Sequence, residues 1–298
     1  MKYKQVVGID IGGSHITSAV VNFGGFEIIA ETYVRTRINA MDGVENIISG
    51  WAAGIKQTVG DNPLSDVCLG VAIPGPFDYD KGISYMRDQG KYDALYGLDV
   101  KELLADALRI SPDQIRFSND AACFLQGEIY RGGMDQSKKT IGFTLGTGLG
   151  SAYMEDGAAY DADLWNSPYQ GGIIEEYISS RWFVKVFKER TGGEIKDVKR
   201  LVTDFGTETV AQTIFRDFSR NLASFLASTV KQMGAEAIVL GGNITKASDY
   251  FLEEVKLQLK EILGLDIPIR LSVLGEDAAL IGAAALFYPK KDLNPSNL

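Results

Sequence analysis

The stretch Val7-Gly-Ile-Asp-Ile-Gly-Gly-Ser14 decides the fold that this sequence predicts. Its apolar residues end at a pair of glycines, and another apolar run follows over residues 16–21. We therefore expect two strands joined by a tight turn. The same pattern returns at Gly142-Phe-Thr-Leu-Gly146, where residues 151–154 supply the returning strand.

A second pair of segments supports this repetition. Residues 67–73 are apolar throughout, as expected of a strand buried on both faces, and Pro74-Gly75-Pro76 ends the run. Residues 237–242 repeat the arrangement in the second half of the chain. Two copies predict a duplicated α/β fold, because a solenoid would show more repeats. We expect one lobe over residues 1–118 and the other over 119–298, with the last helix packing back on the first lobe.

The segments between these runs have helical or strand periodicity. Residues 27–34 predict a third strand beside the first two. Apolar residues recur at helical spacing elsewhere, and this predicts helices over residues 44–59, 99–108, 121–130, 173–189, 208–233 and 250–262. Asp99 and Glu102 are placed to cap the second of these helices.

The composition narrows the classes of function. The net charge is −9 and no block of Lys and Arg compensates it, so we expect no nucleic-acid partner. The apolar stretch over residues 278–289 is too short to span a bilayer, and we expect a cytoplasmic protein with no membrane partner. The two cysteines, Cys68 and Cys123, lie in apolar runs and are expected to be reduced core residues.

Three glycine-rich turns follow apolar strands, and they indicate binding of an anion. Glycine lets backbone N–H groups approach and converge on a phosphate. The turns are Gly12-Gly13-Ser14, the segment from Gly146 to Gly150, and Gly241-Gly242-Asn243. One such turn is typical of a simple hairpin, but three favour a nucleotide site. The chain contains no Walker sequence, and the spacing from Gly146 to Gly150 does not fit a Rossmann turn.

These motifs resemble those of the ROK family (repressors, open reading frames and sugar kinases), in the superfamily of actin-like ATPases and sugar kinases. Residues 7–14 look like its first phosphate motif and Thr144-Leu-Gly-Thr-Gly-Leu-Gly150 like its second. Gly70-Val-Ala-Ile-Pro-Gly-Pro76 looks like its sugar-side loop, Asn119-Asp120-Ala121 like its catalytic motif, and Val239-Leu-Gly-Gly242 like its adenosine motif.

The resemblance implies two duplicated actin-like (ribonuclease H-like) lobes with an interlobe cleft. It implies a glucokinase-like enzyme that uses ATP and Mg²⁺ to phosphorylate a hydroxyl of a hexose or N-acetylhexosamine. Asp120 would be the catalytic base, and Asp10 would hold the Mg²⁺ shell through water. Asp120 could instead be only the N-cap of the helix that follows it.

Two further sets of residues follow from the resemblance. ATP and its phosphates would be bound by Asp10, Gly12, Gly13, Ser14, Gly146, Thr147, Gly148, Gly241 and Gly242. The sugar would be bound by Gly75, Asn119, Asp120, Asp163, Asn166 and Glu175.

The chain departs from the family in one region. Many bacterial members carry Glu-x-Gly-His and a zinc motif with three cysteines, but here the matching segments are Asp163-Leu-Trp-Asn166 and Tyr169-Gln-Gly-Gly-Ile-Ile-Glu175. The resemblance therefore implies no structural zinc, with Asp163 and Asn166 in place of the family's Glu and His. His15, where the family often has Lys, is expected to be a surface turn residue.

Two alternatives remain open. Repressors of the family carry an N-terminal helix-turn-helix domain, whereas the first phosphate motif here begins at Val7, so we expect a kinase rather than a repressor. A sugar- or nucleotide-binding protein without catalysis is the second alternative, because the Glu-x-Gly-His sequence is missing. The sequence leaves the sugar, the phosphorylated hydroxyl and a homodimer undecided.

Overall fold

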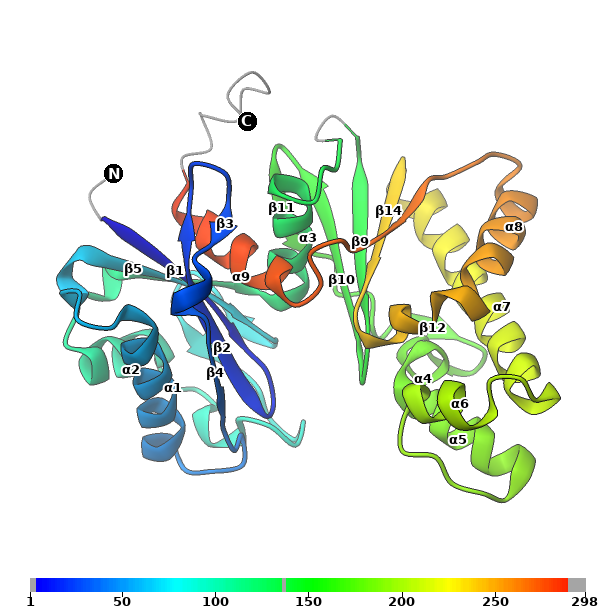
Figure 1. Ribbon diagram of the computed structural model, residues 1–298, viewed down its shortest axis with the longest axis horizontal. Coiled ribbons are helices and arrows are strands. Elements are labelled where there is room, and N and C mark those ends of the chain that lie inside the picture. The colour runs from blue at the N-terminus through cyan, green and yellow to red at the C-terminus, as the bar shows by residue number, and fades with distance from the viewer. Residues whose placement is uncertain (1–3, 136–137, 289–298) are drawn as a thin grey trace. The chain divides into compact units, whose positions relative to one another are not determined.

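The computed structural model describes residues 4–135 and 138–288 and divides into two compact units (Figure 1). The first unit comprises residues 1–135, 156–160 and 276–298, and the second comprises residues 136–155 and 161–275. Residues 119–135 thus belong to the first unit, although the sequence-based boundary assigns them to the second lobe. The reason is that helix α3 (Asp120–Tyr130) packs against helix α9 (Asp277–Ala284).

The remaining elements of the first unit occur in the following order. Its strands are β1 (Gln5–Ile11), β2 (His15–Asn22), β3 (Glu27–Ile28), β4 (Val34–Arg37), β5 (Val67–Ile73), β6 (Phe77–Asp78), β7 (Ile83–Ser84) and β8 (Ile115–Asn119). Its helices include α1 (Val44–Val59) and α2 (Val100–Leu108), and its 3₁₀ turns are η1 (Ala30–Thr32), η2 (Leu64–Asp66), η3 (Asp93–Leu95), η4 (Pro112–Gln114) and η6 (Ala285–Phe287). The chain passes from one unit to the other within β11 (Ala158–Asp161).

The second unit is built from the following elements. Its strands are β9 (Thr140–Leu145), β10 (Leu149–Glu155), β12 (Pro168–Tyr169), β13 (Gly172–Ile173), β14 (Ala237–Gly241) and β15 (Ile269–Leu271). Its helices are α4 (Glu175–Ile178), α5 (Ser180–Thr191), α6 (Val198–Phe205), α7 (Thr209–Met233) and α8 (Leu252–Leu263), with the 3₁₀ segment η5 (Asn243–Tyr250) before α8.

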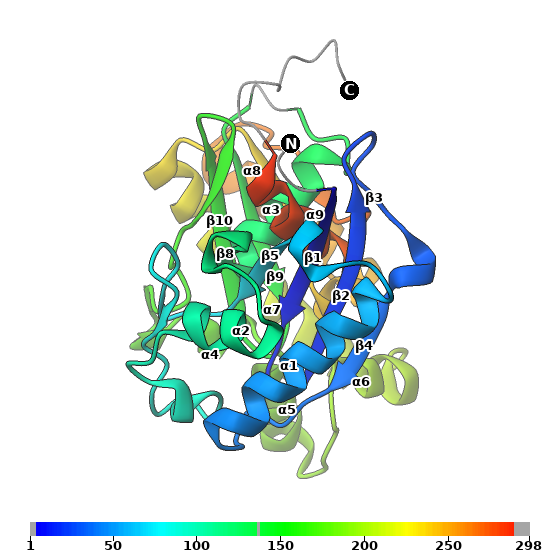
Figure 2. The same ribbon diagram turned by 90° about the vertical axis from the view of Figure 1, so that its left-hand side faces the viewer.

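The sheet of the first unit runs β3-β2-β1-β5-β8, with β4 also paired to β2. β2 is antiparallel to β1, whereas β5 and β8 are parallel to it. Side chains alternate between the two faces, so Val7, Ile9 and Ile11 pack into the core beneath α1 and α2. Helix α9 covers the opposite face (Figure 2).

Helix α9 approaches this face closely because glycines lie at the contacts. An ideal Cβ on Gly8 of β1 would lie 2.0 Å from the Leu280 carbonyl oxygen, and one on Gly70 of β5 would lie 1.9 Å from that of Ala283. The contact with α3 has the same character, since a Cβ on Gly127 would lie 2.0 Å from the Ala278 oxygen. No side chain larger than hydrogen fits at these positions without moving the backbone.

The second sheet confirms the predicted duplication. Its strands run β11-β10-β9-β14-β15, and β10 is antiparallel to β9 whereas β14 and β15 are parallel to it. The first unit has the same pattern in β2-β1-β5-β8. The pairs matched in the sequence, residues 8–12 with 142–146 and residues 67–74 with 237–242, therefore occupy equivalent strands and the turns that follow them.

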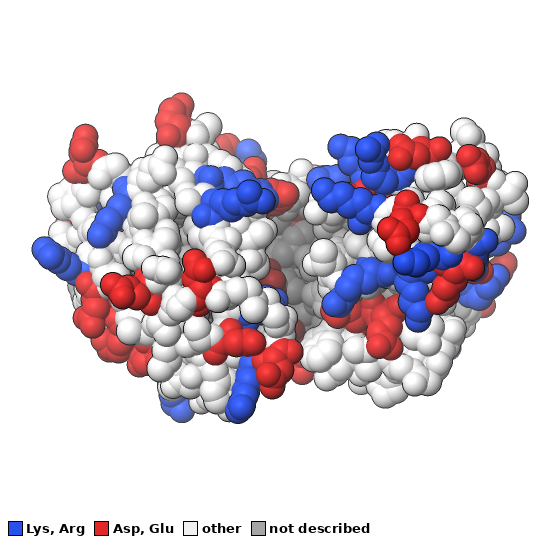
Figure 3. Space-filling model, turned by 90° about the horizontal axis from the view of Figure 1, so that it is seen from below, with Lys and Arg blue, Asp and Glu red and all other residues white. Residues whose placement is uncertain are grey.

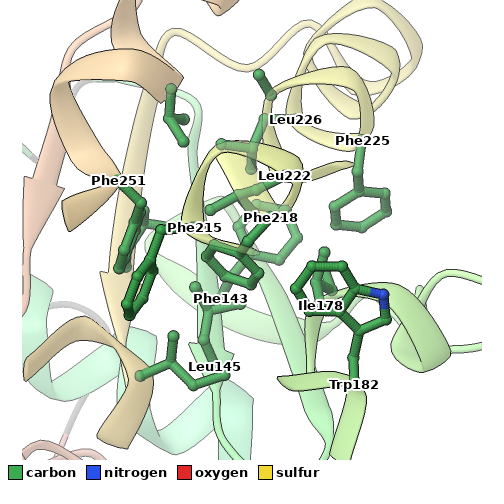
Figure 4. Close-up of a cluster of buried hydrophobic side chains, with 14 of the residues drawn as sticks. Phe143, Leu145, Ile178, Trp182, Phe215, Phe218, Leu222, Phe225, Leu226 and Phe251 are labelled. Carbon is green, nitrogen blue, oxygen red and sulfur yellow. The ribbon is translucent and has the colours of Figure 1, made fainter. Parts of the chain in front are cut away.

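The core of the second unit is aromatic. Phe218 of α7 lies at its centre, with ring centroids 4.7 Å from Phe183 and 5.0 Å from Phe251 (Figure 4). Phe143 of β9 and Phe225 of α7 pack against each other on the side of this core that faces the sheet, with ring centroids 5.4 Å apart. These rings come from helices α5 and α7, from strand β9 and from the turn before α8, so they hold the helices against the sheet.

Two expected elements are broken in the structure. Residues 27–34 were predicted as one strand, but the 3₁₀ turn η1 interrupts it, and the Thr32 hydroxyl both accepts from the Val20 N–H and donates to the Ile29 oxygen. Residues 173–189 were predicted as one helix, but Ser179 is extended and separates α4 from α5. There the Ser180 N–H donates to the Gly146 oxygen at 2.7 Å, so a tertiary contact replaces a helical bond.

The other predicted helices are confirmed, including α1, whose bounds match the expected residues 44–59. Asp99 caps α2 by accepting a hydrogen bond from the Glu102 N–H at 3.0 Å. Among the described residues, no helix is long and apolar enough to cross a membrane. On the face drawn in Figure 3, Lys and Arg side chains are interspersed with Asp and Glu on both units.

Two glycine-to-alanine substitutions in helix interiors test the close contact of α9. Gly127→Ala places a methyl group against the Ala278 backbone, so we expect it to destabilise the protein by about 1–3 kcal/mol or more. Gly50→Ala in α1 meets only the Ile38 side chain, at 3.8 Å. We expect it to stabilise the protein by about 0.5–1 kcal/mol, because alanine is the better helix former. Urea denaturation measures both, and equal effects of the two changes would refute the steric argument.

Candidate functional site

The predicted residues of the first unit lie at one edge of its sheet. β1, β5 and β8 are parallel neighbours, so their carboxyl ends meet at this edge, where parallel sheets bind ligands. The Gly12-Gly13-Ser14 turn follows β1, Gly75 follows β5, and Asp120 follows β8. The fold thus gathers predicted phosphate and sugar residues that are far apart in the sequence.

Asp10 lies near the end of β1, on the same face as Gly8 and partly exposed. Burial raises the pKa of its carboxyl to about 7, and the negative charges of Asp120 and Glu276 add to the rise. Arg35 opposes this rise and forms an ion pair with Glu276. Asp10 therefore sits among other carboxylates, where a bound cation would favour its charged form.

Asp120 is the first residue of α3 and is also partly exposed. Burial raises the pKa of its carboxyl, while the Lys91 ammonium and the Ala121 N–H oppose the rise. The Ala121 N–H donates to Asp120 Oδ1 at 2.9 Å. A carboxyl with a raised pKa, open at a sheet edge, is suited to accept a proton.

The N-cap of α3 is Asn119, so the interpretation of Asp120 as only the cap is wrong. Asn119 Oδ1 accepts from the N–H groups of Ala121 at 2.8 Å and Ala122 at 3.2 Å. Its Nδ2 donates to the Tyr79 hydroxyl at 3.2 Å. This cap fixes the start of α3 and leaves the Asp120 carboxyl outside the capping role.

The first glycine turn is held from outside the β1–β2 hairpin. The Tyr92 hydroxyl donates to the Gly12 oxygen at 2.6 Å. Within the hairpin, the Gly12 N–H donates to the His15 oxygen, and Ser14 Oγ lies 2.9 Å from His15 Nδ1. His15 itself begins β2 and is half-buried, so it is a strand residue rather than the expected surface turn residue.

In the second unit, two glycine turns lie side by side at the ends of β9 and β14. Gly241 pairs with Thr144, and a Cβ on Gly242 would lie 2.4 Å from the Leu145 oxygen. Gly242 also has a φ of 89°, which side-chain-bearing residues rarely adopt. The structure thus brings the predicted phosphate turn, Gly146 to Gly148, next to the predicted adenosine motif.

Glu175 supports the same phosphate turn. Its carboxylate accepts from the Leu149 N–H at 2.9 Å and forms an ion pair with Arg181 at 2.5 Å. A Cβ on Gly148 would lie 2.7 Å from Glu175 Oε2, so a side chain at this position would displace the carboxylate. The carboxylate predicted to contact sugar therefore also orders the second turn.

The other two predicted sugar residues of this unit lie in the loop before Glu175. The Glu175 N–H donates to the Trp165 oxygen at 3.2 Å, which ties that loop to the start of α4. Asp163 is exposed, and its Oδ1 accepts from Trp165 Nε1 at 2.8 Å. Asn166 is exposed as well. Asp163, Asn166 and Glu175 are therefore parts of one local structure.

The first unit offers a carboxylate of the kind that holds Mg²⁺. The part of the chain that the structure describes has no cluster of three or more His, Cys, Asp or Glu residues arranged for a metal. Cys68 and Cys123 are buried and free, as expected for core residues. Mg²⁺ is commonly held by one or two carboxylates together with phosphates and water, and Asp10 offers such a carboxylate.

Sequence reasoning missed several residues around Asp10 and Asp120. They are Arg35, Tyr79, Lys91, Tyr92 and Glu276. Lys91 and Tyr92 follow an exposed polar segment, residues 87–90, which has no periodicity. No local pattern could have assigned them to the site, because each contact joins segments distant in sequence.

Comparison with known proteins agrees with this architecture. A glucokinase of Halalkalibacterium halodurans is 23% identical, over 96% of this chain and 96% of its own length. An N-acetyl-D-glucosamine kinase of Haemophilus influenzae is 23% identical over 95% and 99%, respectively. The crystal structure of a ROK family glucokinase from Streptomyces griseus, in complex with glucose and AMPPNP, matches with a TM-score of 0.75. It is 20% identical, over 95% of this chain and 99% of that one.

These comparisons and the two similar sheets define a protein with the α/β fold of actin-like ATPases. The sequence model of the ROK family matches residues 6–162 and 167–290. This chain therefore belongs to the ROK family, as its motifs predict.

The raised pKa of the Asp10 carboxyl predicts a pH-dependent stability. A folded-state pKa raised from 3.8 to about 7 means that the folded protein binds more protons than the unfolded chain between these values. Stability is therefore lost as pH rises from about 4 to 7. Asp10→Asn removes this loss, so its stability advantage over the wild type should grow through this range and level off above it.

Urea denaturation of ligand-free protein in a chelator, from pH 4 to 8.5, measures this difference. Glu261→Gln neutralises an exposed carboxyl of α8 and reports the effect of removing one surface charge. A stability difference between Asp10→Asn and wild type that stays constant with pH would contradict the assignment of a raised pKa.

Glu175→Ala removes the acceptor of the Leu149 N–H beside the phosphate turn. We expect a loss of about 1–3 kcal/mol in stability, because the N–H is left without its partner. Arg181→Ala removes only an exposed ion pair and should cost at most about 1 kcal/mol. Guanidinium denaturation compares the two, and an equal cost would show that the ion pair alone matters.

Proposed function

We propose that this chain is an ATP-dependent kinase that phosphorylates a hydroxyl of a hexose or N-acetylhexosamine. One observation carries the proposal: Asp10 and Asp120 lie close enough to raise the pKa of Asp10, beside the Gly12-Gly13-Ser14 turn. A phosphoryl transferase needs a phosphate-binding turn and a carboxylate base at one place. The names of the curated relatives, which match over nearly their whole lengths, support this class of reaction.

Asp120 has the properties of the general base. A sugar hydroxyl is a poor nucleophile until its proton is accepted, and a base works best when its pKa lies near the operating pH. Burial raises the pKa of Asp120, whereas Lys91 and the Ala121 N–H stabilise its anion and oppose the rise. In the proposed reaction Asp120 accepts the hydroxyl proton, and Asn119 keeps α3, and with it Asp120, in position.

The phosphates would be bound at the glycine turns, where the absence of side chains lets a ligand approach the backbone. The residues of these turns are Gly12, Gly13 and Ser14 in the first unit and Gly146, Thr147, Gly148, Gly241 and Gly242 in the second. The N–H groups of Gly12 and Gly146 already donate within their turns, to the oxygens of His15 and Gly148. Asp10 would hold the water shell of Mg²⁺, which when bound neutralises charge on the phosphates. We propose Gly75, Asn119, Asp120, Asp163, Asn166 and Glu175 as sugar contacts.

A second candidate is a sugar- or nucleotide-binding protein without catalysis. It is favoured by the residues that replace the family's Glu-x-Gly-His, since Asp163 and Asn166 are both exposed and Asp163 binds Trp165. The presence of Asp120 in an environment that raises the pKa of its carboxyl favours the kinase. An assay of ADP release over common hexoses and N-acetylhexosamines separates the two candidates, because only the kinase releases ADP in step with added sugar.

Asp120→Asn tests the role of the base. The change keeps the size of the side chain, so folding and AMPPNP binding should stay near wild type while kcat falls by about 10²–10⁴. Asp113→Asn, at an exposed site in the same unit, should leave kcat unchanged. Retention of more than about a tenth of wild-type kcat by Asp120→Asn would exclude general-base catalysis by this residue.

A further inference from the structure

Lys91 is anchored at the first glycine turn by the residue that follows it. Tyr92 is fully buried, and its φ of 59° turns the backbone sharply. Its N–H donates to the Ala40 oxygen at 2.7 Å, its hydroxyl donates to the Gly12 oxygen at 2.6 Å, and its ring packs against Trp51. Burial raises the pKa of this hydroxyl, so it stays a donor. Tyr92 therefore fixes the backbone of Lys91 beside the turn.

The side chain of Lys91 passes beside the turn, and its charge reaches the proposed base. An ideal Cβ on Gly13 would lie 4.0 Å from Lys91 Cδ, so the aliphatic stem passes next to this glycine. The side chain is half-buried, and its ammonium acts electrostatically on Asp120. Lys91 thus connects the two parts of the site that must meet during phosphoryl transfer.

Among the described residues, the Lys91 ammonium takes part in no structural ion pair. Within residues 4–135 and 138–288, the ion pairs of up to 4 Å do not include Lys91. Lys91 is thus held on a buried anchor with its charge available to a ligand. The negative charges of Asp120 and Glu276 act on Asp10 here, and these carboxylates would repel an incoming phosphate. A cation at this place offsets that repulsion.

We propose that Lys91 is a further catalytic residue, whose ammonium contacts the transferred phosphoryl group over Gly13 and stabilises its charge in the transition state. The inference rests on the proposed kinase function. In the reaction the sugar oxygen forms a bond to the γ-phosphorus of ATP, and the bond from that phosphorus to the bridging oxygen breaks. The electron pair of that bond leaves with ADP, and the hydroxyl proton passes to Asp120. Lys91 stays protonated throughout and contributes only charge and hydrogen bonds.

Lys91→Met keeps the aliphatic stem and removes the charge. We expect kcat to fall by about 10²–10³, the effect of losing one donor to transition-state charge. We also expect affinity for AMPPNP, measured by calorimetry, to fall at least several-fold while affinity for ADP is unchanged. Lys91→Arg should restore part of both, because it restores the charge. Lys81→Met, an exposed lysine of the same unit, is the matched control and should change neither.

Three results would overturn the inference. Wild-type kcat and wild-type AMPPNP affinity in Lys91→Met would exclude the contact. A rise in sugar KM at constant kcat would assign Lys91 to the sugar instead. Equal losses of ADP and AMPPNP affinity would indicate a general disturbance of the turn. If the wild-type chain phosphorylates no sugar, the proposed function fails, and the comparison of AMPPNP with ADP still decides whether Lys91 contacts the terminal phosphate.

Discussion

The close approach of α9 to the first sheet and to α3 is the contact on which the site depends. Gly8, Gly70 and Gly127 let the backbone of α9 lie against two strands and a helix at once, and Gly282 of α9 would place a Cβ 1.8 Å from the Cys123 oxygen of α3. β1 ends at the first glycine turn and α3 begins at Asp120. One helix therefore sets the distance between the two carboxylates, because it locks α3 to the sheet that carries Asp10.

The same packing creates the electrostatics of the site. Glu276 directly precedes α9, and its charge adds to the effects that raise the pKa of Asp10. Burial is the larger cause for both Asp10 and Asp120, and the cations that oppose it differ, namely Arg35 for Asp10 and Lys91 for Asp120. Each carboxylate is thus opposed by a different cation, which fits the different roles proposed for the two residues.

The two units share a strand pattern but support their glycine turns differently. In the first unit a buried tyrosine from a distant loop holds the Gly12 carbonyl. In the second, the Glu175 carboxylate holds the Leu149 N–H, and the Ser180 N–H holds the Gly146 carbonyl. The Tyr92 hydroxyl occupies a carbonyl of its turn, whereas the Glu175 carboxylate occupies an N–H group. Duplication of the strands therefore did not duplicate the chemistry of the turns.

The sequence by itself determined the strands, the glycine turns and most helices, because these follow from local periodicity and from residues with special backbone freedom. Uninterrupted apolar runs marked β5 and β14, and the motifs around Asp10 and Asp120 identified the family. The tertiary structure decided where elements predicted from local patterns are interrupted. The Ser180 N–H bonds to Gly146 and divides a predicted helix, and the Thr32 hydroxyl bonds to β2 and divides a predicted strand. It also placed Lys91, Tyr92 and Glu276 at the site, since their contacts join segments far apart in the chain. The raised pKa values of Asp10 and Asp120 depend on burial, which no local pattern encodes.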